Sequence, residues 1–72
     1  MKPLPFRVVK RRLEAAGFAE VSQRGSHVKF ARTQGSIVDT VIVPKKREIP
    51  QGTIRSILNQ GHLDAEEWEV LG

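Results

Sequence analysis

Two Gly-Ser pairs, at positions 25–26 and 35–36, constrain the fold of this chain most, because each interrupts strand-like sequence. Residues 19–24 and 27–32 alternate with period two, and residues 37–43 are rich in β-branched side chains and end before Pro44. Short turns that contain glycine join neighbouring antiparallel strands. The sequence therefore predicts three antiparallel strands over residues 19–24, 27–32 and 37–43.

The middle strand divides its side chains between two faces. Side chains two residues apart on a strand point the same way. Val28 and Phe30 are therefore expected to face the core, and His27, Lys29 and Ala31 the opposite side.

Helical spacing of apolar residues flanks the strands on both sides. Before the strands, an apolar stripe begins after Pro5, a residue favoured near a helix start, and stops before Gly17, a residue favoured just past a helix end. Phe18 is expected to pack back on the last turn of this helix. After them, Pro50 is expected at the first helical position of a helix that Gly61 ends. The stripes are Phe6, Val9, Leu13 and Ala16 in the first helix, and Ile54, Ile57 and Leu58 in the second.

A last short helix is predicted near the end of the sequence. Asp64 and Glu67 have capping-box spacing, and Trp68 and Leu71 supply its apolar side chains. The predicted fold class is α+β: one domain over residues 1–72, ordered α-β-β-β-α plus the short C-terminal helix, with the helices on one face of a three-stranded antiparallel sheet.

Length and composition limit the chemistry. A chain of 72 residues buries only ~60% of its unfolded surface, so a deep substrate cavity is not expected. The absence of cysteine removes disulfides, thiolate ligands and thiol nucleophiles. The longest apolar run, residues 41–43, is far shorter than the ~20 residues that span a bilayer. We expect a cytoplasmic protein without a membrane partner.

The net charge of +4 conceals an uneven distribution. Residues 1–60 contain all 12 Lys and Arg but only four of the eight acids, a balance of +8, and residues 61–72 contain the other four acids. A basic body suits a polyanionic partner such as RNA, because neutralised phosphates release counterions. An ordinary solvated surface is the alternative.

His27 is the candidate for acid-base chemistry. An unperturbed histidine side chain titrates at pH ~6.5 and so exchanges a proton near neutral pH. Its position, directly after a tight turn and on the face opposite the core, leaves it accessible to a substrate. The alternative is a histidine that only ends an edge strand.

The motifs, taken in order, resemble one protein family. The element order resembles the double-stranded-RNA-binding-domain (dsRBD) fold, and the motifs resemble the HicA (YcfA-like) family of mRNA interferase toxins over almost the whole chain. These motifs are Ala16-Gly17-Phe18, Gly25-Ser26-His27 with Phe30, Val43-Pro44, the run 50–58, and the run 63–68. The resemblance implies a type II toxin-antitoxin toxin, an endoribonuclease that cleaves mRNA and is neutralised by a HicB-type antitoxin, with His27 as its catalytic residue.

Metal-independent RNA cleavage also needs cations near the phosphate. Arg24 lies across the turn from His27, Lys29 shares its face, and the small Gly25-Ser26 pair lets a phosphate approach the backbone. Lys45 and Lys46 add a basic loop. We expect RNA contacts at Arg24, Gly25, Ser26, Lys29, Lys45 and Lys46.

One position departs from the family pattern. Many relatives carry a second histidine shortly after the Val-Pro pair, where this chain has Lys45, Lys46 and Arg47. Lys46 can carry a proton, but lysine with its usual pKa of ~10.4 is a poorer shuttle near neutral pH, so weak activity is expected. The other histidine, His62, lies between the last two helices, where a loop role is expected.

The sequence offers no other recognisable site. Two histidines 35 residues apart without cysteine do not make a structural zinc site, and no Gly-rich Walker-type loop is present, so neither a metal nor a small-molecule cofactor is expected. Two other classes stay open: a non-catalytic RNA-binding module of the same fold, and a protein-interaction domain that docks through its apolar and acidic tail.

Overall fold

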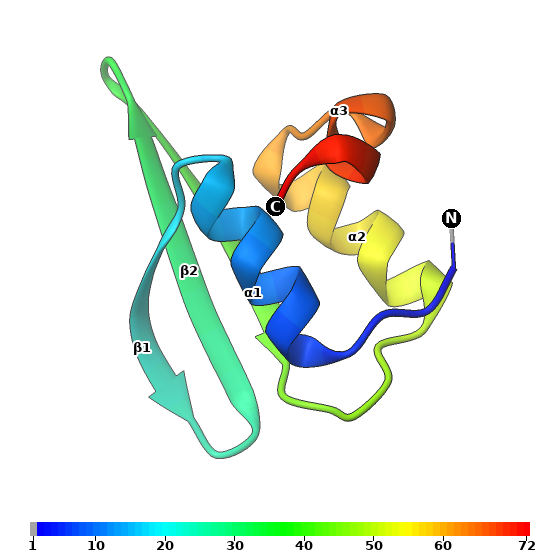
Figure 1. Cartoon of the computed structure of the whole chain (residues 1–72). Coiled ribbons are helices and arrows are strands. Elements are labelled where there is room, and N and C mark those ends of the chain that lie inside the picture. Colours follow the sequence, from blue (N-terminus) through cyan, green and yellow to red (C-terminus); the bar gives the residue numbers. More distant parts are fainter. Residues whose placement is uncertain (1) are drawn as a thin grey trace.

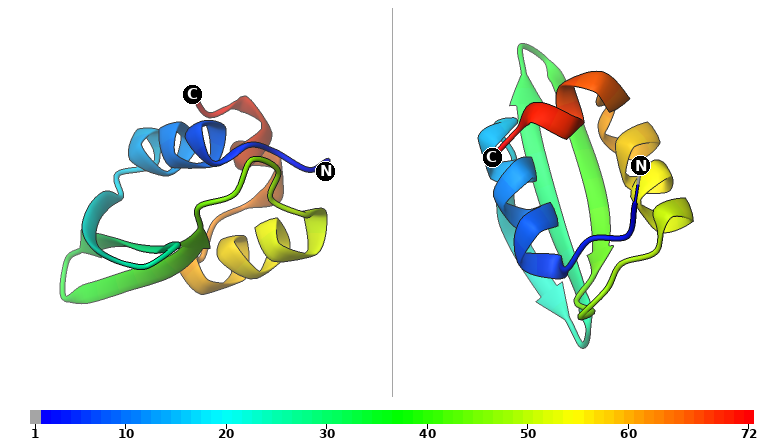
Figure 2. Two further views of the ribbon diagram at one scale, coloured as in Figure 1. Left: turned by 90° about the horizontal axis from the view of Figure 1, so that it is seen from below. Right: turned by 45° about the vertical axis from the view of Figure 1, so that its right-hand side comes forward.

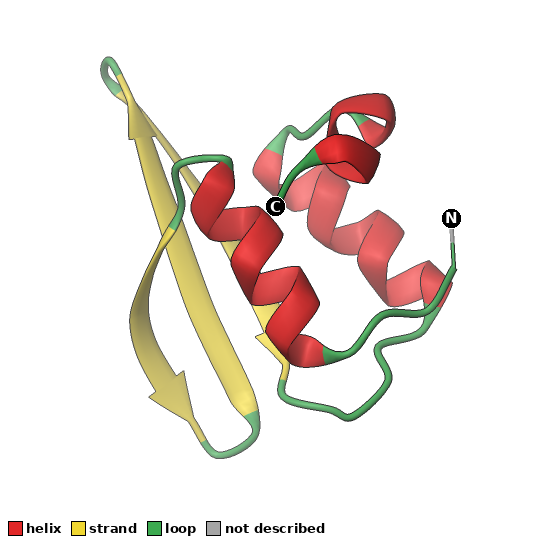
Figure 3. Cartoon of the chain, in the orientation of Figure 1, coloured by secondary structure: helices red, strands yellow, loops and turns green. Residues whose placement is uncertain are grey.

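The computed structural model describes residues 2–72, and its elements follow the predicted order (Figures 1 and 3). They are α1 (Phe6–Ala15), β1 (Ala19–Arg24), β2 (His27–Gln34), β3 (Ile37–Pro44), α2 (Gln51–Gly61) and α3 (Ala65–Val70). The strands form an antiparallel sheet in the order β1-β2-β3. This confirms the α+β, dsRBD-like layout. The β2–β3 ladder continues to the Gln34–Ile37 pair, which makes β2 two residues longer than predicted.

The helices lie together on one side of the sheet (Figures 1 and 2). Val28 and Phe30 are buried on that side, as predicted, and pair across the ladder with the buried Val43 and Val41. The helices add the rest of the core, whose fully buried members include Val9, Leu13, Ile54, Ile57 and Trp68. The other side of the sheet is left uncovered.

α1 ends in the predicted glycine cap. Gly17 takes a positive φ of 98°, its N–H donates to Glu14 O at 3.0 Å, and the Phe18 N–H donates to Leu13 O at 2.9 Å. This pair of bonds is a Schellman motif, in which the residue after the glycine packs on the last turn. Phe18 is accordingly buried beside Leu13 in the core.

α2 differs from the prediction at its start and ends at Gly61 as predicted. Pro50 is its N-cap, not its first helical residue, and Gly61 is its last helical residue. The left-handed residue is His62, with φ 53° and ψ 45°. Gly61 is required for packing instead, because a Cβ there would lie 3.0 Å from side-chain atoms of both Phe18 and Val41.

α3 is held by its cap and by one aromatic side chain. Asp64 Oδ1 accepts a hydrogen bond from the Glu66 N–H at 2.8 Å, one residue earlier than the capping box with Glu67 predicts. Trp68 is fully buried, so α3 is docked on the core. Among residues 2–72, no helix is both long enough and apolar enough to cross a membrane.

Candidate active site

His27 is the first residue of β2 and lies on the uncovered side of the sheet. Arg24 is its partner on β1, and Lys29, two residues along β2, pairs with Ser22 on one side and Ile42 on the other. Together these five side chains line a shallow hollow of about 410 Å³. The structure therefore brings Arg24, His27 and Lys29 together, and adds Ser22 and Ile42, which the sequence did not single out.

The turn beside the hollow has the geometry that a two-residue link requires. Gly25 takes a φ of 60°, and Ser26 does not have a positive φ, which is the pattern of a type II′ hairpin turn. The Ser26 carbonyl accepts a hydrogen bond from the Lys45 N–H at 2.6 Å. Gly25 and Ser26 thus border the hollow without lining it.

A β-bulge at Val21 determines which charges face the hollow. The register shifts between Glu20 and Ser22, so Ser22 pairs with Lys29 while Glu20 pairs with Phe30. Because Phe30 faces the helices, Glu20 lies on the helix side as well, where its carboxylate is 3.3 Å from Lys10 Nζ. Strict alternation from Arg24 would have placed Glu20 among the basic side chains.

The loop after β3 lies at the same end of the molecule but outside the hollow. The Lys46 carbonyl accepts from the Phe6 N–H at 3.1 Å, and Lys45 Nζ lies 5.8 Å from the centre of the Phe6 ring. Lys45 and Lys46 are both exposed. They therefore extend the basic surface from the turn toward the start of α1, and neither lines the hollow.

A second charged cluster lies on the helix side of the sheet. Arg32 NH2 is 3.0 Å from Asp39 Oδ2, and His62 Nδ1 is 2.8 Å from Asp39 Oδ1. Arg32 also donates to the carbonyls of Ala16 at 3.1 Å and Gly61 at 2.9 Å, at the ends of α1 and α2. The hydrogen bond from Arg32, and then that from His62, lower the pKa of Asp39, against the raising effect of its burial.

The two histidines belong to different places. His27 and Arg32 are five positions apart on β2, about 17 Å along an extended strand. Arg32 also points to the opposite face. His62 is therefore excluded from the hollow: it lies in the turn after α2, as expected, and there its ring contacts the carboxylate of Asp39.

The fold and the hollow define a small α+β protein of dsRBD-like layout with a basic, uncovered sheet face. The model of the family described as "HicA toxin of bacterial toxin-antitoxin" matches residues 6–63. The chain belongs to this family and is a toxin of a toxin-antitoxin system, a class whose partner is an antitoxin. A search of curated proteins finds no match to the chain.

Proposed function

We propose that this toxin is a metal-independent mRNA interferase, an endoribonuclease in which His27 acts as the acid-base group. The observation that carries the proposal is the hollow on the uncovered sheet face, where one histidine lies between two cationic side chains. None of the five lining residues is a carboxylate. Such a site favours an anionic phosphodiester and supplies a proton acceptor beside it.

The proposed reaction uses the RNA's own nucleophile. His27 takes the proton of the 2′-hydroxyl, the 2′-oxygen forms a bond to phosphorus, and the bond from phosphorus to the 5′-oxygen breaks. Arg24 and Lys29 offset the negative charge that builds on the phosphoryl oxygens. Lys46 does not line the hollow, so in this proposal water protonates the leaving oxygen, and we expect weak activity.

The test separates cleavage from folding and binding. His27→Ala should lower the cleavage rate by roughly 10² to 10⁴, the usual contribution of one acid-base group, and leave RNA affinity near that of the wild type. His62→Asn is the matched control, because it removes the histidine outside the hollow and asparagine tolerates the left-handed conformation. Reactions are run in chelator, with RNA and with a strand carrying one 2′-deoxy nucleotide at the scissile position.

Three outcomes would contradict the proposal. A folded His27→Ala protein that cuts at the wild-type rate removes His27 from the chemistry. Wild-type cleavage at the 2′-deoxy position removes the 2′-hydroxyl as the nucleophile. Wild-type protein that retains RNA but never cuts it supports the alternative, a non-catalytic RNA-binding module, which is favoured by the presence of a single acid-base group in the hollow.

We further propose that the antitoxin is of the HicB type and covers this hollow. Ile42 lines the hollow and is 42% exposed, and Val38 lies on the same face of β3 and is 61% exposed. A partner with apolar side chains for this row and carboxylates for the adjacent cations would bury the site. Hydrogen exchange, compared between the free toxin and its complex with the antitoxin of the neighbouring gene, should show protection at residues 24–32. Protection limited to residues 61–72 would contradict this.

A further inference from the structure

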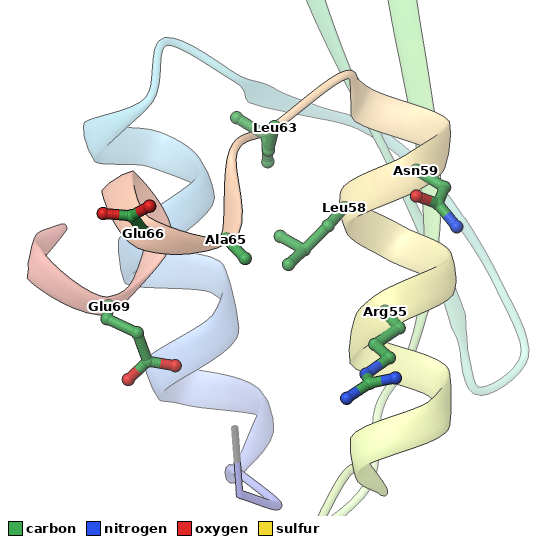
Figure 4. A pocket seen from close by; sticks show the side chains of 7 residues that line it. All are labelled: Arg55, Leu58, Asn59, Leu63, Ala65, Glu66 and Glu69. Carbon is green, nitrogen blue, oxygen red and sulfur yellow. The ribbon is translucent and has the colours of Figure 1, made fainter.

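A groove between α2 and α3 lies away from the candidate active site. Its volume is about 710 Å³. Leu58 and Leu63 form its apolar floor, Arg55 reaches toward it from α2, and Glu66 and Glu69 lie on the α3 side (Figure 4). α3 and the β1–β2 turn are at opposite ends of the molecule (Figure 1). The family match ends at residue 63, so the α3 wall lies beyond the matched residues.

The two walls of the groove carry opposite charges that do not meet. Among residues 2–72, Arg55, Glu66 and Glu69 take part in no ion pair. Beside the acidic wall is Val70, which is 84% exposed, the highest value among the exposed large apolar side chains. It lies one helical turn beyond Glu66, on the same side of α3. Within residues 2–72, the cation and the two carboxylates of the groove thus have no ionic partner, and the exposed Val70 lies beside the acidic wall without lining the groove.

This combination of groups is complementary to itself. In a two-fold dimer the same surface faces its own copy, so residue i of one protomer meets residue j of the other and j meets i. Arg55 of each protomer would then face Glu66 and Glu69 of the other, and Val70 of each would cover the other's apolar floor. We propose that the α2–α3 groove is a homodimer interface of this toxin.

The proposed dimer goes beyond the proposed nuclease function and does not depend on it. The groove is on the helix side, whereas the hollow at His27 is on the uncovered side of the sheet. Both hollows would stay open in the dimer. Two sites on one particle would let the dimer engage a single RNA strand twice, which raises the overall affinity without new contacts.

The test is a charge exchange between two variants. Arg55→Glu makes the groove entirely acidic, and Glu66→Arg with Glu69→Arg makes it entirely basic, so each variant repels its own copy. In an equimolar mixture of the two variants, each mixed dimer has both of its attractive contacts between position 55 and positions 66 and 69 restored. Sedimentation equilibrium should show the wild type approaching twice the 8.1 kDa protomer mass as the concentration rises to about 1 mM. Each variant alone should dissociate at least about tenfold more readily, and the mixture should associate like the wild type.

The matched control carries Glu14→Arg and Glu67→Arg, which change the net charge as much as the two groove substitutions do but line no part of the groove. It should associate like the wild type. The proposal is overturned if the wild type stays monomeric at about 1 mM, if the mixture does not associate, or if the control also dissociates. Concentration-dependent amide shifts should fall on residues 55–70; shifts centred on residues 24–29 would place the interface elsewhere.

Discussion

Arg32 is expected to be the most important polar side chain for the stability of this toxin. Its guanidinium lies 4.6 Å from the centre of the Phe18 ring and donates to Asp39 and to the last carbonyls of both long helices. Its side chain is 13% exposed and that of Asp39 only 3%. Arg32→Met would keep most of the apolar stem but leave a buried carboxylate and two helix ends without their donor.

The cost follows from this burial. Removing one partner of a buried ion pair typically costs about 3–5 kcal/mol, whereas an exposed pair contributes at most about 1 kcal/mol. A domain of this length has a total stability of about 4–11 kcal/mol, at 0.05–0.15 kcal/mol per residue. Arg32→Met should therefore remove a large fraction of the free energy of unfolding.

Urea denaturation at pH 7 measures this loss, because Trp68 is the only tryptophan and is fully buried, so its fluorescence reports unfolding. Arg24→Met is the matched control: Arg24 is exposed, and the change should stay within about 0.5 kcal/mol. Arg32→Met combined with Asp39→Leu should recover stability, because no charge is then left unpaired. A loss below about 1 kcal/mol for Arg32→Met would refute the reasoning.

The same network sets the response to acid. Because folding lowers the pKa of Asp39 below its ordinary value of 3.8, its ionised form stabilises the fold above that value. This contribution should be lost as the pH falls below 3.8 through the lowered pKa. Wild-type stability should therefore fall over this range, and the variant that lacks both Arg32 and Asp39 should show a smaller fall. Equal slopes for the two proteins would contradict the assignment.

Two further predictions concern packing and RNA contact. A methyl group on Gly61 would press on two buried side chains, so Gly61→Ala should lower the free energy of unfolding by about 1–2 kcal/mol in a urea titration. The control is Gly52→Ala, in the same helix with open space around it, which should be neutral or stabilising by up to about 1 kcal/mol. Equal stabilities of the two variants would refute this. Charge reversal at Lys45 and Lys46 should flatten the dependence of log affinity for single-stranded RNA on log salt by about one to two units, and an unchanged slope would mean that this loop makes no phosphate contact.

Much of the framework was predictable because it depends on neighbouring residues. The Gly-Ser turns, the glycine after α1 and the burial of Val28 and Phe30 all follow from local conformational preference and from the period-two alternation of a strand. The placement of Arg24, His27 and Lys29 on one face was predictable for the same reason. This placement depends only on the register of the single hairpin that β1 and β2 form.

Other features of the fold and of the site depend on contacts between residues far apart in the sequence, so only the tertiary structure determines them. The bulge at Val21 that keeps Glu20 away from the hollow is a property of strand pairing, and Ile42 enters the hollow only because β3 lies beside β2. Gly61 ends its helix as expected, but the left-handed residue is His62, and it is packing between elements that requires a glycine at position 61. Asp39 likewise contacts partners that are distant in the sequence, one on β2 and one at the end of α2. Such contacts between elements override the local conformational preference of any single segment.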